Sequence, residues 1–103
     1  MNPETVYNFE WNPAKALRNV RKHDVTFDQA ATVFLDALAL TVYDEANSQN
    51  EDRWFTLGYD SSGKLLAVAH SYEVTGPTSV RIRIISARKA TRRERRSYEE
   101  EPQ

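Results

Sequence analysis

V-R-I-R-I-I-S-A, from Val80 to Ala87, is the most informative segment of this 103-residue chain. Apolar and basic residues alternate along it, and a period of two is typical of a β-strand whose two faces meet different surroundings. The positions predicted to face the core are Val80, Ile82 and Ile84. Arg81 and Arg83 are predicted to share the opposite face with Ile85. A strand that supplies core residues holds its arginines in fixed positions, as a phosphate-binding site requires.

The positive charge of the chain is concentrated around this strand. Eight of the fourteen Lys and Arg residues fall within residues 81–96, which contain one acid, Glu94, although the net charge of the chain is −1. Such clustering usually faces polyanions; the alternative is a solvated surface, or a complement to acidic residues of the same chain. Residues 36–60 carry six acids against one base, Arg53, so we expect a lopsided charge distribution.

The composition is typical of a single soluble domain. A chain of 103 residues can bury its own core, and 40% hydrophobic with 28% charged residues is ordinary for globular proteins. The longest apolar run is too short to cross a membrane, and no secretory leader is expected. The absence of cysteine excludes disulfides, thiolate catalysis and Cys-based zinc sites, and fits a reducing cytoplasm. Since His23 and His70 are the only histidines and lie far apart in sequence, no metal or other cofactor is expected.

A short strand from Tyr7 to Trp11 is predicted to lead into the first helix. Asn12 followed by Pro13 starts this helix, because Asn caps and Pro is tolerated in the first turn, and the helix is expected to reach about His23. Its predicted apolar line contains Ala16 or Leu17, Val20 and the ring of His23. The opposite stripe is basic and contains Lys15, Arg18 and Lys22.

A second helix follows, with Thr26 and Gln29 as a capping box. Apolar residues recur behind it at helical spacing, which predicts a core-facing stripe. The stripe consists of Phe27, Ala30, Ala31, Phe34 and Leu35.

The rest of the chain reads mainly as strands. Ala39 to Tyr43 is rich in strand formers, and the acidic stretch after it, with Glu51 and Asp52 close by, is read as solvated loop surface. Arg53 to Tyr59 and Lys64 to Tyr72 form the clearest hairpin, joined by the turn Asp60-Ser61-Ser62-Gly63. A looser loop around Gly76-Pro77 leads to the arginine strand.

The last predicted element is a helix from Thr91 to about Glu100. Thr91 and Glu94 form its capping box. Its one large apolar residue is Tyr98, which is expected to anchor the helix. Because a helix that is polar all round packs poorly alone, we expect this one to be frayed or held by a partner.

Four segments resemble the BrnT family, in the same order and across nearly the whole chain. They are F-E-W-N-P-A-K (Phe9 to Lys15), R-K-H-D-V-T-F-D-Q-A (Arg21 to Ala30), R-W-F-T-L-G (Arg53 to Gly58) and R-I-I-S-A-R-K-A-T-R-R-E-R (Arg83 to Arg95). The most specific part is I-I-S-A-R-K-A-T. The family commonly has Gly after the K-H pair, whereas this chain has Asp24, which tolerates a positive φ.

The resemblance implies a fold and a function. BrnT proteins are toxins of bacterial type II toxin–antitoxin modules, with a compact fold like that of the RelE ribonucleases, and a BrnA antitoxin that also binds DNA neutralises them. The expected fold class is therefore α+β, a single RelE-like domain spanning residues 1–103. We expect an antiparallel sheet of about four strands packed against two N-terminal helices, with a C-terminal helix. The expected partners are RNA and a BrnA-like antitoxin, with DNA reached only through the antitoxin.

RNA can be cut without a metal ion when its own 2′-hydroxyl attacks the neighbouring phosphorus. The reaction needs a proton acceptor, cations for the extra negative charge and an acid for the leaving 5′-oxygen. The planar guanidinium of arginine suits phosphate oxygens, and charge stabilisation in a partly dry site is usually the largest catalytic contribution. Arg83 and Arg88 are the first candidates, in keeping with the Arg, Lys and Tyr residues that RelE-like toxins use.

His70 is the third catalytic candidate, because a histidine on the hairpin could transfer protons near neutral pH. The alternative is a half-buried histidine that bonds to the backbone. The candidates for RNA binding are Arg53, Arg81, Lys89, Arg92 and Arg93. For Arg53 the alternative is a local salt bridge with Glu51 or Asp52. For Lys89, Arg92 and Arg93, the alternative ligand is an acidic segment of the antitoxin.

Two functions compete at this point. One is a metal-independent endoribonuclease toxin that blocks translation, and the other is a non-catalytic RNA-binding or antitoxin-binding module. The two share a basic surface. An Arg83→Ala variant that keeps RNA affinity but loses toxicity would favour the enzyme.

Overall fold

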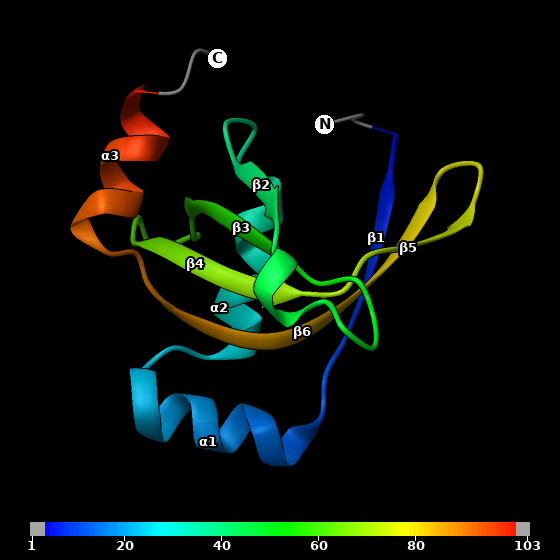
Figure 1. The fold of residues 1–103 in the computed structure, drawn as a ribbon, viewed down its shortest axis with the longest axis horizontal. Helices are drawn as coiled ribbons and strands as arrows, with labels where there is room; N and C mark the ends of the chain where they lie inside the picture. The colour runs from blue at the N-terminus through cyan, green and yellow to red at the C-terminus, as the bar shows by residue number, and fades with distance from the viewer. Residues whose placement is uncertain (1–3, 101–103) are drawn as a thin grey trace.

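The computed structural model describes residues 4–100 and folds them into one mixed β-sheet with helices on both faces (Figure 1). Within this range the strands are β1 (Val6–Glu10), β2 (Leu40–Tyr43), β3 (Trp54–Tyr59), β4 (Leu65–His70), β5 (Glu73–Gly76) and β6 (Ser79–Lys89). The helices are α1 (Pro13–His23), α2 (Phe27–Thr32) and α3 (Arg92–Glu100), with 3₁₀ turns η1 (Val33–Leu35) and η2 (Glu45–Asn47). The strand order is β1-β6-β4-β3-β2, and β5 also pairs with β6.

The long strand β6 connects the parts of the sheet. It pairs in parallel with β1 and antiparallel with both β4 and β5. The register with β4 shifts so that Ile85 has no opposite residue, which marks a bulge. The predicted alternation is confirmed, because Val80, Ile82 and Ile84 are 4%, 0% and 1% exposed while Arg81 is exposed and Arg83 half-buried.

Two apolar clusters lie on the two faces of the sheet. The larger one, under α1 and α2, contains Phe27, Val33 and Phe34 together with the core-facing residues of β6. The smaller one contains Leu57, Leu65, Ala67 and Tyr98 and lies under α3. β4 contributes to both clusters, and all six of its residues are buried. Helices therefore cover both faces of the sheet, whereas the prediction packed only the two N-terminal helices against it.

The predicted helix starts are confirmed. Asn12 Oδ1 accepts hydrogen bonds from the N–H groups of Ala14 and Lys15 at 2.9 and 3.1 Å. Helix α1 ends at Asp24 with φ 56°, a left-handed conformation that Asp tolerates. The capping box of Thr26 and Gln29 forms as predicted, although α2 gives way to a 3₁₀ turn after six residues. Leu35, at the end of that turn, is 75% exposed, so its place in the predicted core stripe is wrong.

The core-facing side of α1 also differs from the prediction. Leu17 and Val20 are 62% and 38% exposed, whereas Asn19 is buried. The Asn19 amide donates to the carbonyls of Val25 and Ala87 and accepts from the N–H of Ala87, at 2.8 to 3.0 Å. Its side chain thus replaces a neighbouring strand along the edge of β6, a contact that apolar periodicity does not reveal.

The predicted antiparallel four-stranded sheet is wrong in two respects. β1 joins the sheet in parallel, with Val6 opposite Ser79 and Glu10 opposite Arg83. β5 forms where a loop was expected and pairs its Val74 with Val80. The pairing of β1 was missed because parallel strands join segments that are distant in sequence, without a local turn that could be recognised. Strand β5 was missed because it is only four residues long.

Helix α3 is held by the chain itself, so the prediction that it is frayed or needs a partner is wrong. Tyr98 is 8% exposed, its ring packs edge-on against Tyr59 at 5.4 Å, and its hydroxyl donates to Asp36 at 2.7 Å. One aromatic anchor with a charged hydrogen-bond partner replaces a continuous apolar stripe. The capping box of Thr91 and Glu94 forms as predicted.

Candidate active site

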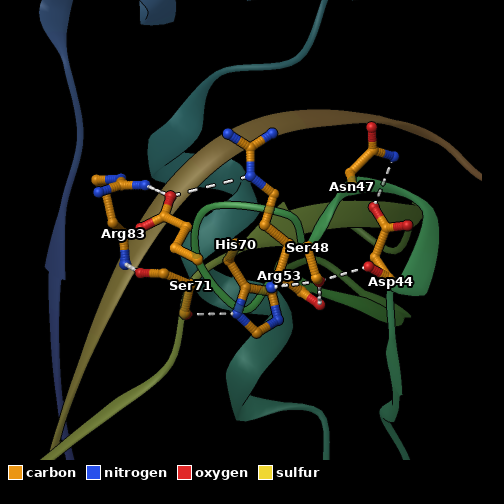
Figure 2. A network of polar contacts seen from close by, with 8 residues as sticks. Asp44, Asn47, Ser48, Arg53, His70, Ser71 and Arg83 are labelled. Carbon is orange, nitrogen blue, oxygen red and sulfur yellow. Dashed lines mark hydrogen bonds and ion pairs between the residues drawn. The ribbon is translucent and has the colours of Figure 1, made fainter.

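Two of the predicted arginines meet at one carboxylate, that of Glu51 (Figure 2). Arg83 Nη2 forms an ion pair with Glu51 Oε1, and Arg53 Nε lies 3.9 Å from the same oxygen. The side chains of Arg83, Glu51 and Arg53 are 41%, 38% and 35% exposed, so solvent and ligands reach them. The local salt bridge considered for Arg53 is thus present. Glu51 is thus more than the solvated loop surface predicted for it, and no local pattern in the sequence marks it as a site residue.

Backbone hydrogen bonds hold the cluster in place. Ser71 lies just beyond β4, where its N–H donates to the Arg83 carbonyl at 3.0 Å and its hydroxyl accepts from the Arg83 N–H at 3.1 Å. On the other side, Ser48 Oγ accepts from the Arg53 N–H at 3.0 Å, and the Asp44 N–H donates to the Arg53 carbonyl at 2.8 Å. The loop between β2 and β3 therefore returns to the sheet and brings Glu51 to Arg83.

His70 is fully buried on the other side of the sheet. Its strand position is opposite Ile84, a core position, and its ring packs edge-on against Phe34 at 4.9 Å. The structure therefore does not bring the His70 ring to Arg83 or Arg88. The ring instead bonds to the backbone, as the alternative prediction proposed, because Nδ1 lies 2.8 Å from the Ser71 carbonyl oxygen.

The hydrogen bonds of His70 define its protonation. A carbonyl only accepts, so Nδ1 carries the proton and donates to Ser71, while Nε2 accepts from the Thr56 hydroxyl at 2.7 Å. Thr56 in turn is 2.8 Å from the hydroxyl of Thr41, which is exposed. Burial lowers the pKa of His70, and the bond to the Ser71 carbonyl opposes this shift only in part. The ring is thus neutral at physiological pH.

Arg88 lies apart from Arg83. It comes five positions after Arg83 on the same strand, which is about 15 Å at the rise of a β-strand. Arg88 donates from Nη1 and Nη2 to the two carboxylate oxygens of Glu94 at 2.7 and 3.0 Å. This fork raises the pKa of Arg88 and lowers that of Glu94. Since Glu94 also caps α3, the pair fastens this helix to β6.

The predicted RNA-binding residues other than Arg53 fall into two groups. Arg81 stands on the exposed end of β6 and pairs with Glu73 of β5 at 2.7 Å. Lys89, Arg92 and Arg93 are exposed around the start of α3 and form no ion pair with any residue of the described range. The structure thus brings Arg53 and Arg83 together, and places Arg81 and the α3 group on either side of them along β6.

A hollow of about 440 Å³ lies on the face opposite the arginines. Tyr7, Trp54 and Tyr72 contribute aromatic walls, and His70 and Thr56 also line it. Within residues 4–100, no three carboxylate or imidazole groups lie close enough together to hold a metal ion. In the same range, no helix is long and apolar enough to cross a lipid bilayer.

A mixed sheet with helices on both faces and arginines along its longest strand defines a small α+β domain with a cationic face. Residues 11–94 match the family model described as "Ribonuclease toxin, BrnT, of type II toxin-antitoxin system", and the chain belongs to this BrnT family. The predicted family membership is thus confirmed. It implies an RNA substrate and an antitoxin partner.

The fold is similar to the 1.1 Å crystal structure of the Brucella abortus ribonuclease toxin, BrnT. The TM-score is 0.58, with 20% sequence identity, and the match covers 85% of this chain and 100% of that chain. At this identity the similarity concerns the fold alone. Among curated protein sequences, none matches this chain.

Proposed function

We propose that this chain is a toxin endoribonuclease that cleaves RNA without a metal ion at the cluster of Glu51, Arg53 and Arg83, and thereby blocks translation in the cytoplasm. The observation that carries the proposal is the position of one carboxylate between two guanidinium groups on an accessible face of the sheet. The reaction needs both kinds of group, a base for the 2′-hydroxyl and cations for the phosphate.

The proposed step follows the chemistry of RelE-like ribonucleases. The Glu51 carboxylate accepts the proton of the 2′-hydroxyl while the 2′-oxygen forms a bond to the neighbouring phosphorus. Arg83 and Arg53 donate hydrogen bonds to the phosphate oxygens, whose negative charge increases in the transition state. The bond from phosphorus to the 5′-oxygen breaks, and this oxygen takes a proton from solvent. The products are a 2′,3′-cyclic phosphate and a free 5′-hydroxyl.

The ion pairs of the free protein are compatible with this role. Exposed and half-exposed ion pairs contribute about 0 to 1 kcal/mol each, so a phosphate can displace Glu51 from either arginine at little cost. Each guanidinium also has five N–H donors, and a single carboxylate oxygen leaves most of them available.

The remaining predicted residues have supporting roles in the proposal. His70 acts as a positioning residue, because its bond to the Ser71 carbonyl fixes the residue that holds the Arg83 backbone. Arg81 on one side and Lys89, Arg92 and Arg93 on the other would bind phosphates that flank the cleaved one. Arg88 contributes by fastening α3 beside this path. Its predicted catalytic role would require release from Glu94.

Two carboxylates that pair with β6 arginines give a matched test. Glu51→Gln should lower the single-turnover cleavage rate about 10²- to 10⁴-fold, because it removes the proposed base. Glu73→Gln removes the equivalent partner of Arg81 and should cleave near the wild-type rate. Arg83→Ala should cost about 10²- to 10³-fold. Thermal melts of each variant verify that it is folded.

The test has an outcome that would reject the proposed base. If Glu51 only neutralises the arginines, Glu51→Gln frees them, and both RNA affinity and cleavage rise. The whole proposal would be overturned if the wild-type protein cleaved neither free nor ribosome-bound RNA. Cleavage in excess EDTA that leaves 2′,3′-cyclic phosphate ends supports the metal-independent route, and inhibition by EDTA contradicts it.

The alternative function is a module that binds RNA or antitoxin without cleavage. It is favoured by the observation that Arg53, Arg81, Arg83 and Arg88 all face carboxylates, as they would face an acidic protein segment. Salt-sensitive RNA binding without strand breaks would support it. For the antitoxin we propose a BrnA-like protein with acidic groups over the cluster. Co-expression and size exclusion test this, and a harmless protein that stays monomeric when expressed alone counts against it.

A further inference from the structure

A second basic site lies between α1 and β6. A groove of about 340 Å³ separates the helix from the strand, and the side chains along it include Lys15, Arg18, Lys22 and His23. Ile85 and Ser86 of β6 also line it. None of the described residues that line the groove is acidic. The electrostatic potential in the groove is therefore positive and attracts anions.

These cations differ from those of the proposed active site. Arg53, Arg81 and Arg83 on the active-site face each have a carboxylate within 4 Å. Lys15, Arg18 and Lys22 form no ion pair with any residue between 4 and 100. Their positions along α1 place them on one side of the helix, over a length of about 10 Å. An extended polyanion can therefore contact all three without displacing a carboxylate.

The groove exists because β1 ends early. β1 pairs with β6 only as far as Arg83, and the next edge contact on this side is the Asn19 amide at Ala87. Between these two points lies the bulge at Ile85. The edge of β6 is thus not covered by a strand, and α1 crosses it with its basic side chains beside the opening.

The groove lies along the same strand that carries the other cationic residues. Ser86 is three residues from Arg83, about 10 Å along the strand. Beyond the groove, β6 continues to Lys89 and then to the start of α3. In Figure 1, the end of α1 and the start of α3 both lie at the left, where β6 ends.

We propose that this groove is a second, non-catalytic binding site for the phosphate backbone of single-stranded RNA. This second site depends on the proposed function in one respect, namely that RNA is the ligand. Lys15, Arg18 and Lys22 would each contact one phosphate, without reading the bases. The site would hold the RNA strand beside the active site and increase affinity without changing the chemical step.

Binding and cleavage can be separated with a 2′-O-methyl oligonucleotide, which lacks the attacking hydroxyl. Fluorescence anisotropy with the labelled oligonucleotide should show that Lys15→Gln, Arg18→Gln and Lys22→Gln together weaken binding equally across sequences. The slope of log K against log salt should fall by about 2, because each lost phosphate contact removes about 0.7. Single-turnover cleavage at saturating RNA should keep the wild-type rate.

The chain offers matched controls. Arg21 lies on the same helix next to Lys22 but outside the groove, and Lys64 lies in the exposed turn between β3 and β4. Arg21→Gln and Lys64→Gln each remove one positive charge, as each groove substitution does, and should leave the salt slope nearly unchanged. Glutamine is a good helix former, so α1 is retained.

Three outcomes would overturn the proposal. The triple variant could keep the wild-type affinity and salt slope, or the control variants could weaken binding as much as the groove variants. The triple variant could also keep RNA binding but lose a co-expressed antitoxin in pull-down, in which case the groove holds an acidic protein. The proposed function fails separately, through absence of cleavage by the wild type, and binding of the uncleavable oligonucleotide can be measured in that case too.

Discussion

Among single residues, His70 is the one whose surroundings differ most from those of an exposed catalytic histidine. Its two ring nitrogens are engaged by Ser71 and Thr56, and its ring contacts Phe34. A positive charge there would lose hydration, and none of these three contacts carries a negative charge that would compensate for the loss. The folded state therefore favours the neutral form of the His70 ring.

This placement predicts how stability depends on pH. Because burial lowers the pKa of His70 below its ordinary value of 6.5, the unfolded chain binds a proton that the folded protein does not. The stabilisation is fully present above pH 6.5 and is lost as the pH falls, with a slope that approaches about 1.4 kcal/mol per pH unit. Urea unfolding at a series of pH values should show this loss in the wild type.

The variant His70→Gln removes the titrating group while it keeps a side chain that can donate and accept. Its unfolding free energy should be lower overall but flat between about pH 5 and 6.5. Below that window both proteins should lose stability, because hydrogen bonds hold the pKa values of Glu94 and Asp60 below their ordinary values. Equal slopes in the two proteins between pH 5 and 6.5 would contradict the assignment.

At the scale of elements, α3 is anchored by the buried Tyr98, in addition to the Arg88–Glu94 pair at its start. Burial raises the pKa of Asp36, but the hydrogen bond from Tyr98 and the backbone N–H groups of Tyr59 and Leu38 outweigh it and leave the pKa below its ordinary value. Burial and the same carboxylate raise the pKa of Tyr98 to about 12. The two groups stabilise each other only while Asp36 is ionised and Tyr98 is not.

The variant Tyr98→Phe should lower the unfolding free energy by about 1.5 kcal/mol at neutral pH, because it removes a hydrogen bond to a charged group. In the wild type, the contribution of Tyr98 is complete below pH 10 and is lost as the pH rises towards about 12. The variant should lack this part of the alkaline loss. Denaturant melts between pH 7 and 11 measure both effects.

Tyr43→Phe is the control for this prediction. Tyr43 also donates to a carboxylate, that of Asp52 at 2.8 Å, but it is 44% exposed. Its loss should change stability by less than about 0.5 kcal/mol. If the two variants were equally stable, the Tyr98 contact would not be the anchor of α3.

The elements that the sequence predicted well carry local signals. The caps at Asn12 and Thr26, the turn before Gly63 and the alternation along β6 involve residues a few positions apart. The parallel pairing of β1 and the edge contact of Asn19 join distant segments and leave no local pattern. In the same way, Arg83 could be selected from its strand, whereas Glu51 reaches the site through the path of a loop.

For the whole molecule, the central position of β4 predicts where the structure opens last. Its residues are all buried, β3 and β6 flank it, and its side chains enter both apolar clusters. Amide hydrogen exchange should therefore be slowest for Leu66 to Ala69, because only global unfolding exposes them. Edge strand β5 and α3 should exchange faster. Slower exchange in α1 than in β4 would contradict this order.

The strand order also affects how a ribosome-bound chain can fold. β6 is synthesised after all the other strands of the described range, yet it lies between β1 and β4, and β1 pairs with residues 73 positions later in the chain. Such long-range pairing closes slowly and only after both partners exist. A nascent polypeptide that stops before residue 79 lacks all of β6, including Arg83. Incomplete translation products of this toxin are therefore expected to be harmless to the cell that makes them.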